Sequence, residues 1–177
     1  FPVSTELAQV ALAARSISEA TGGAFDVTVD PLVRLWGFGP AGRQREIPPV
    51  AAIAEARARV GWRQLEARLE PPALRRTIAG VTADSSSIAK GFATDALSAL
   101  LAEVGAADHL VQVGGDLRAS GRDAAGVPWR AGIEAPTANH TGVAAVVSLR
   151  ERALSTSGDY RNFFSHEGRR YSHIIDP

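Results

Sequence analysis

The stretch ADSSSIAKGFATDALSALLAEVG, residues 83–105, predicts the strongest helix of this sequence. From about Ser87 to Val104 its apolar residues recur at the spacing of one helical face, and Gly105 stands where a helix commonly ends. The same stretch contains Lys90, the only lysine among nineteen basic residues. We expect the apolar face to pack on the rest of the protein, with these members: Ile88, Ala93, Leu97, Leu100, Leu101 and Val104.

The start of this helix is a candidate anion site. The first turn of a helix has unpaired backbone N–H groups at the positive end of its dipole, so it attracts phosphate, and Lys90 adds a full charge. The segment is not a Walker loop, because its lysine precedes the glycine instead of following it. A compact ammonium suits a crowded phosphate site beside a metal. Asp84 and the serines after it are equally explained as a helix cap, so the residues alone leave both interpretations open.

Helical and strand patterns alternate irregularly around this stretch. Helices are predicted at 4–21, with Ser4 as the N-cap, and at 49–60. Residues 27–29 have the β-branched alternation of a strand and precede an aromatic loop at 36–40. Two or three antiparallel strands are expected within 62–83, and others at 109–113, 117–120, 129–134, 143–149, 160–164 and 171–175. This order predicts a single α+β domain over 1–177, with a mixed, largely antiparallel sheet flanked by helices.

Length and composition narrow the functional classes. A chain of 177 residues and 18.6 kDa with 45% hydrophobic residues fits one globular domain. Nineteen basic residues balance nineteen acidic ones, so no basic surface is expected for nucleic acid or an anionic membrane. The absence of cysteine excludes disulfides and thiolate metal sites. No apolar run approaches the ~18 residues of a membrane span, and the motifs of serine hydrolases and zinc proteases are missing.

Two glycine-containing motifs lie outside the predicted helices. Gly114-Gly115-Asp116 follows the apolar run LVQV, where paired glycines allow either close approach of a ligand or a plain hairpin turn. Residues 155–160, STSGDY, form either a loop that holds a ring and its polar edge or an ordinary turn. Neither motif decides between these alternatives by itself.

The four histidines fall in different settings. His109 is expected at a strand start, His140 in a loop and His166 at a hairpin tip. His173 stands beside Ile174-Ile175, where apolar packing could fix its ring, although a structural histidine is the more common case. His173 is therefore the histidine to consider for catalysis.

Five blocks of this sequence recur in one known family, in the same order. They are GGAFDVTVDPLVRLWGFG (22–39), ADSSSIAKGFATD (83–95), VQVGGDLRASG (111–121), STSGDYRNFF (155–164) and YSHIIDP (171–177). Together they resemble the ApbE family of FAD:protein FMN transferases. The resemblance implies an enzyme that splits the pyrophosphate of FAD with Mg²⁺ present, attaches FMN to a threonine hydroxyl of a partner protein and releases AMP.

The resemblance also implies a partner and a location. The expected acceptor is a flavoprotein subunit of a membrane redox complex or a related electron-transfer protein. The expected location is the periplasm or the outer face of the cytoplasmic membrane, with a lipid anchor in many members. This chain itself has no predicted transmembrane segment and no expected nucleic-acid partner.

Residue roles follow from matching the same blocks. Lys90 is expected to neutralise phosphate charge, and His173 is our hypothesis for the base that takes the threonine proton, because imidazole titrates near neutrality. Ser87 matches a magnesium-contacting position through its backbone carbonyl. The resemblance places these residues in the FAD site: Ala24, Phe25, Asp26, Asp84, Lys90, Gly114, Gly115, Asp116, Thr156, Ser157, Gly158, His173, Ile174 and Ile175.

The resemblance is incomplete at both ends of the chain. Family members have an upstream portion that helps to enclose FAD, and they continue past the HIIDP segment into an Asp and a Thr of the magnesium site. The remaining metal ligands are therefore expected beyond Pro177. Two other functions stay open: a Mg²⁺-dependent FAD pyrophosphatase that uses water instead of threonine, and a non-catalytic FAD-binding module. The ordered blocks disfavour a structural domain without a ligand.

Overall fold

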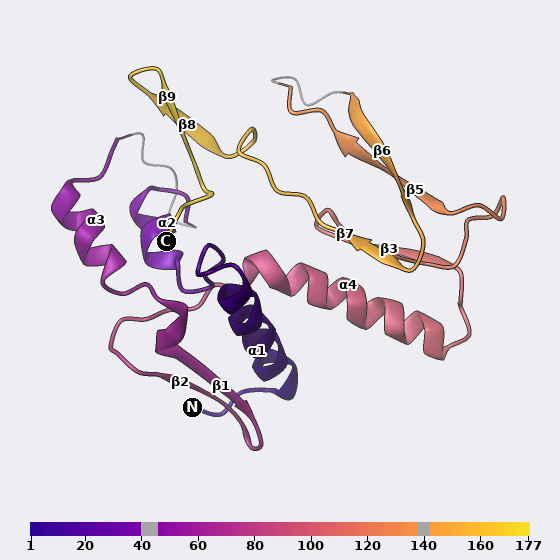
Figure 1. Cartoon of the computed structure of the whole chain (residues 1–177), viewed down its shortest axis with the longest axis horizontal. Helices are drawn as coiled ribbons and strands as arrows, with labels where there is room; N and C mark the ends of the chain where they lie inside the picture. The colour runs from indigo at the N-terminus through magenta and orange to yellow at the C-terminus, as the bar shows by residue number, and fades with distance from the viewer. Residues whose placement is uncertain (40–45, 138–141) are drawn as a thin grey trace. The chain divides into compact units, whose positions relative to one another are not determined.

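The computed structural model describes residues 1–39, 46–137 and 142–177, and the chain divides into two compact units (Figure 1). The first unit contains residues 1–87 and 161–177, and the second contains residues 88–160. Each unit has its own strands and its own buried apolar residues. Pro40 of the expected aromatic loop and His140 lie outside the described residues.

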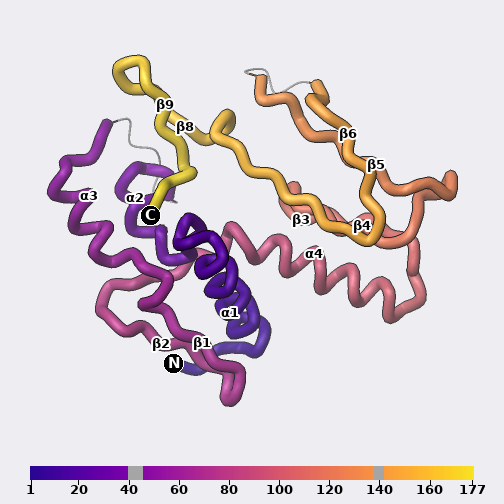
Figure 2. Tube along the Cα trace, in the orientation of Figure 1, coloured from indigo at the N-terminus to yellow at the C-terminus, as the bar shows by residue number. Residues whose placement is uncertain are grey.

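The first unit begins with helix α1 (Thr5–Ala20), which confirms the helix expected at 4–21. Ser4 is its N-cap, because the Ser4 Oγ accepts a hydrogen bond of 3.2 Å from the Leu7 backbone N–H. The helix packs on a two-stranded antiparallel sheet formed by β1 (Leu65–Leu69) and β2 (Pro72–Arg76). Figure 2 shows these two strands side by side near the N-terminus. This sheet confirms the antiparallel strands expected within 62–83.

The strand-like pattern at 27–29 does not form a strand. The Asp26 carboxylate accepts a hydrogen bond of 2.7 Å from the Thr28 backbone N–H, which turns the chain out of an extended path. A short helix, α2 (Asp30–Leu35), follows with Pro31 in its first turn, a position that suits proline. The expectation at 27–29 was therefore wrong, because local side-chain bonding outweighed β-branched propensity.

The rest of the first unit consists of short elements. Helix α3 (Val50–Arg57) confirms the helix expected at 49–60 but ends earlier, and the 3₁₀ turn η1 (Trp62–Gln64) leads into β1. The antiparallel hairpin β8 (Phe163–His166) and β9 (Arg169–Ser172) turns at Glu167-Gly168, both with positive φ. His166 lies at this hairpin tip as expected. The strand expected at 171–175 ends at Ser172, so Ile174 and Ile175 lie beyond it.

The second unit contains most of the long helix α4 (Ser86–Glu103), and its described residues form five strands. Strand β4 (Asp116–Ser120) is the centre of a three-stranded antiparallel sheet, with β3 (His109–Val113) on one side and β7 (Arg152–Leu154) on the other. Strands β5 (Trp129–Glu134) and β6 (Val143–Leu149) form a separate antiparallel ribbon. Ala119, Ala131 and Leu149 form the buried core between these strands.

Helix α4 has the predicted position but not the predicted buried face. Leu97, Leu100 and Val104 are 45%, 54% and 71% exposed, whereas Thr94 and Ser98 are buried. The reason is hydrogen bonding: the Ser98 Oγ lies 2.7 Å from the His109 Nε2, and the His109 Nδ1 lies 2.7 Å from the Ala106 carbonyl. Since a carbonyl only accepts, the Nδ1 carries the proton and the Ser98 hydroxyl donates to Nε2. This bond ties α4 to the start of β3.

The described sheets are all antiparallel, and helices accompany them, so the predicted α+β class is confirmed. None of the described helices combines the length and the apolar character needed to cross a membrane.

Candidate functional site

The second unit brings Lys90 of α4 to the hairpin between β3 and β4. The Lys90 Nζ lies 3.4 Å from the Gly114 carbonyl oxygen and 3.8 Å from the Asp116 Oδ1. The Lys90 side chain is 40% exposed, whereas that of Asp116 is 7% exposed. The cluster is thus an accessible ammonium group beside a buried carboxylate. The sequence singled out all three residues, and the structure places them together.

Glycine at position 114 is required by both backbone and space. Gly114 and Gly115 connect β3 to β4 with φ values of +54° and +96°, a region that side-chain-bearing residues rarely adopt. A Cβ added to Gly114 would lie 2.7 Å from the Lys90 Cδ, whereas nothing lies within 4 Å of one added to Gly115. The pair is therefore a hairpin turn and also the surface over which the lysine side chain passes.

Asp116 connects this turn to the loop after β7. The Ser155 Oγ donates a hydrogen bond of 2.8 Å to the Asp116 Oδ1. The register explains the contact: Leu117 pairs with Leu154, so Asp116 and Ser155 are the next cross-strand neighbours. Ser155 thereby fixes the start of the segment Thr156, Ser157 and Gly158, in which Thr156 and Ser157 are exposed.

The first unit contains another buried carboxylate, that of Asp26. The Asp26 Oδ1 accepts from the Thr28 backbone N–H at 2.7 Å and from its hydroxyl at 2.6 Å, and the Asp26 Oδ2 accepts from the Trp62 backbone N–H at 2.8 Å. The Thr28 hydroxyl oxygen also accepts from the Gly61 backbone N–H at 2.7 Å. Asp26 therefore holds residues 26–28 against 61–62. Its neighbour Ala24 is exposed, and Phe25 is half-buried.

Asp84 prepares the start of α4. Its backbone N–H donates a hydrogen bond of 2.7 Å to the Val27 carbonyl, and its Oδ1 accepts one of 2.8 Å from the Ser86 backbone N–H. Asp84 is therefore a helix-start residue of the kind that the cap interpretation required. Ser87 is exposed in the first turn of the helix.

His173 lies next to a row of aromatic rings in the first unit. Its ring meets Phe38 edge-on at a centroid distance of 6.4 Å, and its Nδ1 lies 3.4 Å from the Asn162 carbonyl. Because that carbonyl can only accept, the arrangement favours a proton on Nδ1 and leaves Nε2 as the proton acceptor. The row continues through Phe164 to Tyr171 and Trp36, with neighbouring rings stacked 5.3–6.5 Å apart.

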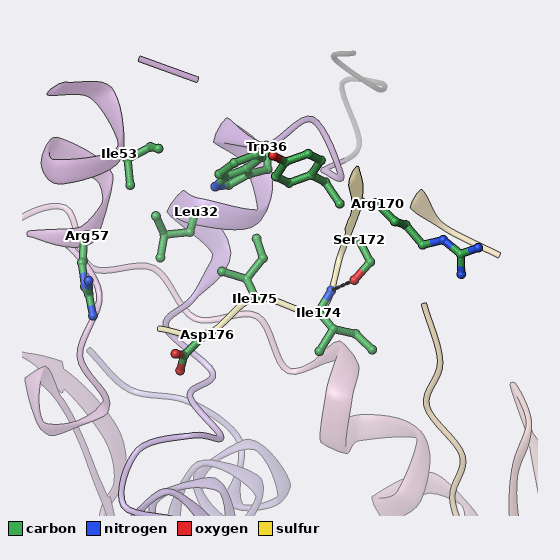
Figure 3. A pocket seen from close by; sticks show the side chains of 10 residues that line it. Leu32, Trp36, Ile53, Arg57, Arg170, Ser172, Ile174, Ile175 and Asp176 are labelled. Atoms are coloured by element: carbon green, nitrogen blue, oxygen red, sulfur yellow. Dashed lines mark hydrogen bonds between the residues drawn. The ribbon is translucent and has the colours of Figure 1, made fainter. Parts of the chain in front are cut away.

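A cavity of about 380 Å³ opens beside this row (Figure 3). In Figure 3, Ile175 points toward Leu32 and Trp36. Arg57 lies at the wall and donates a hydrogen bond of 3.0 Å to the Pro177 carbonyl. The wall is therefore largely apolar and aromatic, with charged groups at its edge, and its residues are Leu32, Trp36, Ile53, Arg57, Arg170, Tyr171, Ser172, Ile174, Ile175 and Asp176.

The described residues do not form a magnesium site by themselves. No group of three or more His, Asp or Glu side chains in 1–39, 46–137 and 142–177 is placed to hold a metal ion. Magnesium prefers six oxygen ligands in near-octahedral geometry, and the Ser87 carbonyl supplies at most one of them.

Comparison with known proteins relates these features to a family. The model of the ApbE family matches residues 1–177. The chain belongs to the ApbE family. The FAD:protein FMN transferase of Salmonella typhimurium (strain LT2) is 40% identical over 179 residues, which cover 100% of this chain and 51% of that protein. The protein of the same name from Vibrio cholerae (strain O395) is 41% identical over 177 residues, 100% of this chain and 52% of that protein.

Solved ApbE structures have the same fold. Flavin transferase ApbE from Vibrio cholerae matches with a TM-score of 0.85 and 39% identity, covering 99% of this chain and 55% of that chain. The apbe protein from Thermotoga maritima matches with a TM-score of 0.85 and 31% identity, covering 99% and 56%. The present chain spans about half the length of the curated relatives it matches.

The residues expected in an ApbE site thus fall into separate groups. Lys90, Gly114 and Asp116 meet in the second unit, and Ser155 joins them to the segment 156–158. Asp26 and Asp84 stabilise turns of the first unit, where His173 and Ile175 belong to the aromatic region. Trp36, Tyr171 and Arg57 were not among the expected site residues, and Ser155 was considered only as part of the loop 155–160. For Ser155 the missing signal was strand register, because β7 was not predicted.

Proposed function

We propose that the protein to which this chain belongs transfers the FMN part of FAD to a threonine hydroxyl of an acceptor protein and releases AMP. Two findings support the proposal: membership of the ApbE family, and relatives named FAD:protein FMN transferase over the whole chain. The structural observation that carries it is the Lys90 ammonium, which is accessible and has only long contacts, of 3.4 Å and 3.8 Å, to described groups.

The reaction assigns clear requirements to the protein. The threonine oxygen attacks the FMN-side phosphorus, the bond from that phosphorus to the bridging oxygen breaks, and AMP leaves with the bridging oxygen. Negative charge grows on the phosphoryl oxygens during this step, and a preorganised cation stabilises it. Lys90 supplies such a cation. The Lys90 side chain passes over the Gly114 turn, with its Nζ 3.4 Å from the Gly114 carbonyl oxygen.

We propose His173 as the base that removes the threonine proton. The Asn162 carbonyl beside Nδ1 leaves Nε2 as the nitrogen that can accept a proton. General-base help contributes typically about 10²–10⁴-fold to the rate. Replacement of His173 by alanine should therefore reduce transfer by about that factor, with FAD binding measured separately. Undiminished transfer with retained binding would reject this role.

The proposal includes a requirement for Mg²⁺ and an exported acceptor. When bound, magnesium would stabilise the developing phosphoryl charge. The acceptor is proposed to be a flavoprotein subunit of a membrane redox complex or a related electron-transfer protein, at the periplasmic or outer face of the cytoplasmic membrane. Chelation with EDTA should abolish transfer, and restored Mg²⁺ should recover it.

The test is mass spectrometry of a threonine-containing acceptor flavoprotein subunit after incubation with FAD, Mg²⁺ and the native full-length protein. Transfer predicts a covalent FMN adduct and an equal amount of AMP. Free FMN and AMP without an adduct would indicate the pyrophosphatase, and intact FAD would indicate a binding module. Either of these outcomes would overturn the transferase proposal.

A further inference from the structure

We propose that Ser155 is a positioning residue that keeps the Asp116 carboxylate from forming a direct hydrogen bond with Lys90, so that the ammonium stays available to an anion. The inference rests on the proposed function, because the anion in question is the pyrophosphate of FAD. It concerns a residue outside the set expected from the sequence. It also assigns Asp116 a role as counter-ion instead of a ligand contact.

The distances show that the Asp116 carboxylate is bonded to Ser155 and only weakly in contact with Lys90. The Asp116 Oδ1 is 2.8 Å from the Ser155 Oγ but 3.8 Å from the Lys90 Nζ. A hydrogen bond from nitrogen to oxygen is about 2.7–3.2 Å long, so the lysine contact is electrostatic only. The oxygen that Lys90 approaches is therefore also the one that accepts the serine hydrogen bond, which uses one of its two lone pairs.

The other polar contact of the Lys90 ammonium is also long. An ammonium group has three N–H donors. Among the described residues, Lys90 contacts only the Gly114 carbonyl, at 3.4 Å, and Asp116. A tight ion pair would have to be broken before phosphate could bind, whereas this loose one does not. Asp116 is buried, so a carboxylate that loses the Ser155 hydroxyl needs another hydrogen-bond donor, and Lys90 is the neighbouring group that can replace it.

A plain structural role for Ser155 makes different predictions. If the serine only tied the segment 155–158 to β4, its removal would act regardless of the charge at Asp116 and of Lys90. The positioning role requires both partners. Its effect should disappear when Asp116 is replaced by asparagine, and also when Lys90 is replaced by methionine. A double-mutant cycle separates the two roles.

The first measurement uses the amine itself and no flavin. Lys90 is the only lysine of these 177 residues, so amine-reactive labelling followed by peptide mapping reports on it directly. In Ser155→Ala a direct hydrogen bond from the ammonium to the carboxylate should shield the amine, and labelling of Lys90 should slow by about threefold or more. Ser155→Thr, which keeps a hydroxyl, should label at the wild-type rate. So should Ser148→Ala, an exposed serine on β6 of the same unit.

The second measurement is the dissociation constant for FAD, with inorganic pyrophosphate as a second probe. Ser155→Ala should weaken both by about tenfold, while Ser155→Ala in an Asp116→Asn or Lys90→Met background should change them by less than about twofold. Unchanged labelling, or an equal loss in all three backgrounds, would overturn the inference. If Lys90→Met itself binds FAD normally, the proposed anion role fails instead. Labelling that still responds to Ser155→Ala would then keep the geometric part of the inference.

Discussion

Replacement of Gly114 by alanine should displace the Lys90 side chain and also strain the backbone, and these two effects can be measured separately. The new Cβ would lie 2.7 Å from the Lys90 Cδ, whereas carbon atoms in contact normally lie about 3.5–4.0 Å apart. The lysine side chain must therefore retreat by about 1 Å, and a displacement of this size can cost about 10²-fold in rate. The left-handed backbone adds about 1–2 kcal/mol of strain, which lowers the melting temperature by about 2–8 °C.

Gly105→Ala is the matched control. Gly105 follows α4 with φ of +86°, and nothing lies within 4 Å of an added Cβ. It should lose similar stability but keep its affinity for FAD and its transfer rate. The initial rate of FMN transfer to an acceptor subunit and differential scanning calorimetry of both variants measure the rate and the stability. Equal transfer rates in the two variants would refute the proposed link between the Gly114 turn and Lys90.

Three further predictions concern buried and charged groups away from Lys90. Asp26→Asn places an amide against backbone donors and should lower the free energy of unfolding by about 1–3 kcal/mol in urea; an unchanged midpoint would contradict the bonding described for Asp26. Ser98→Ala leaves the buried His109 Nε2 without its donor and should cost about 1–3 kcal/mol in the same assay, a loss that Ser98→Thr should largely avoid. The pKa of Glu151 is lowered from its ordinary value of 4.5, mainly by the hydrogen bond that its carboxylate accepts from the Gly121 backbone N–H. This contact therefore stabilises the fold above pH 4.5, and the stabilisation is lost as the pH falls through the lowered pKa. Glu151→Gln should reduce the slope of stability against pH in that acidic range, and identical slopes would argue against the contact.

Local sequence patterns were sufficient to predict the elements that are stabilised mainly by residues near in sequence. The periodicity of 87–104 and its closing glycine predicted α4 within one residue at each end, and LVQV followed by two glycines predicted the turn of the β3–β4 hairpin. The buried face of α4 could not be read from apolar residues. It depends on the Ser98–His109 hydrogen bond, which joins residues from two elements.

Elements and contacts that depend on the pairing of strands distant in sequence could not be predicted. Strand β7 has three residues, too few for a pattern, and exists because it pairs with β4. The register of this pairing is what brings Ser155 to Asp116, so the contact could not be predicted without the strand. Similarly, the hydrogen bonds of Asp26 to backbone donors 2 and 36 residues away could not be predicted from the sequence, because the second of them depends on tertiary contact.

The proposed mechanism depends on Lys90 holding the pyrophosphate of FAD. Binding of FAD and of riboflavin, which has the same ring system but no phosphate, should therefore be compared in wild type and Lys90→Met. We expect the FAD affinity to fall at least about tenfold, a loss of about 1.4 kcal/mol, and the riboflavin affinity to stay unchanged. Equal FAD affinity in the two proteins, or an equal loss for both ligands, would show that Lys90 does not hold the pyrophosphate.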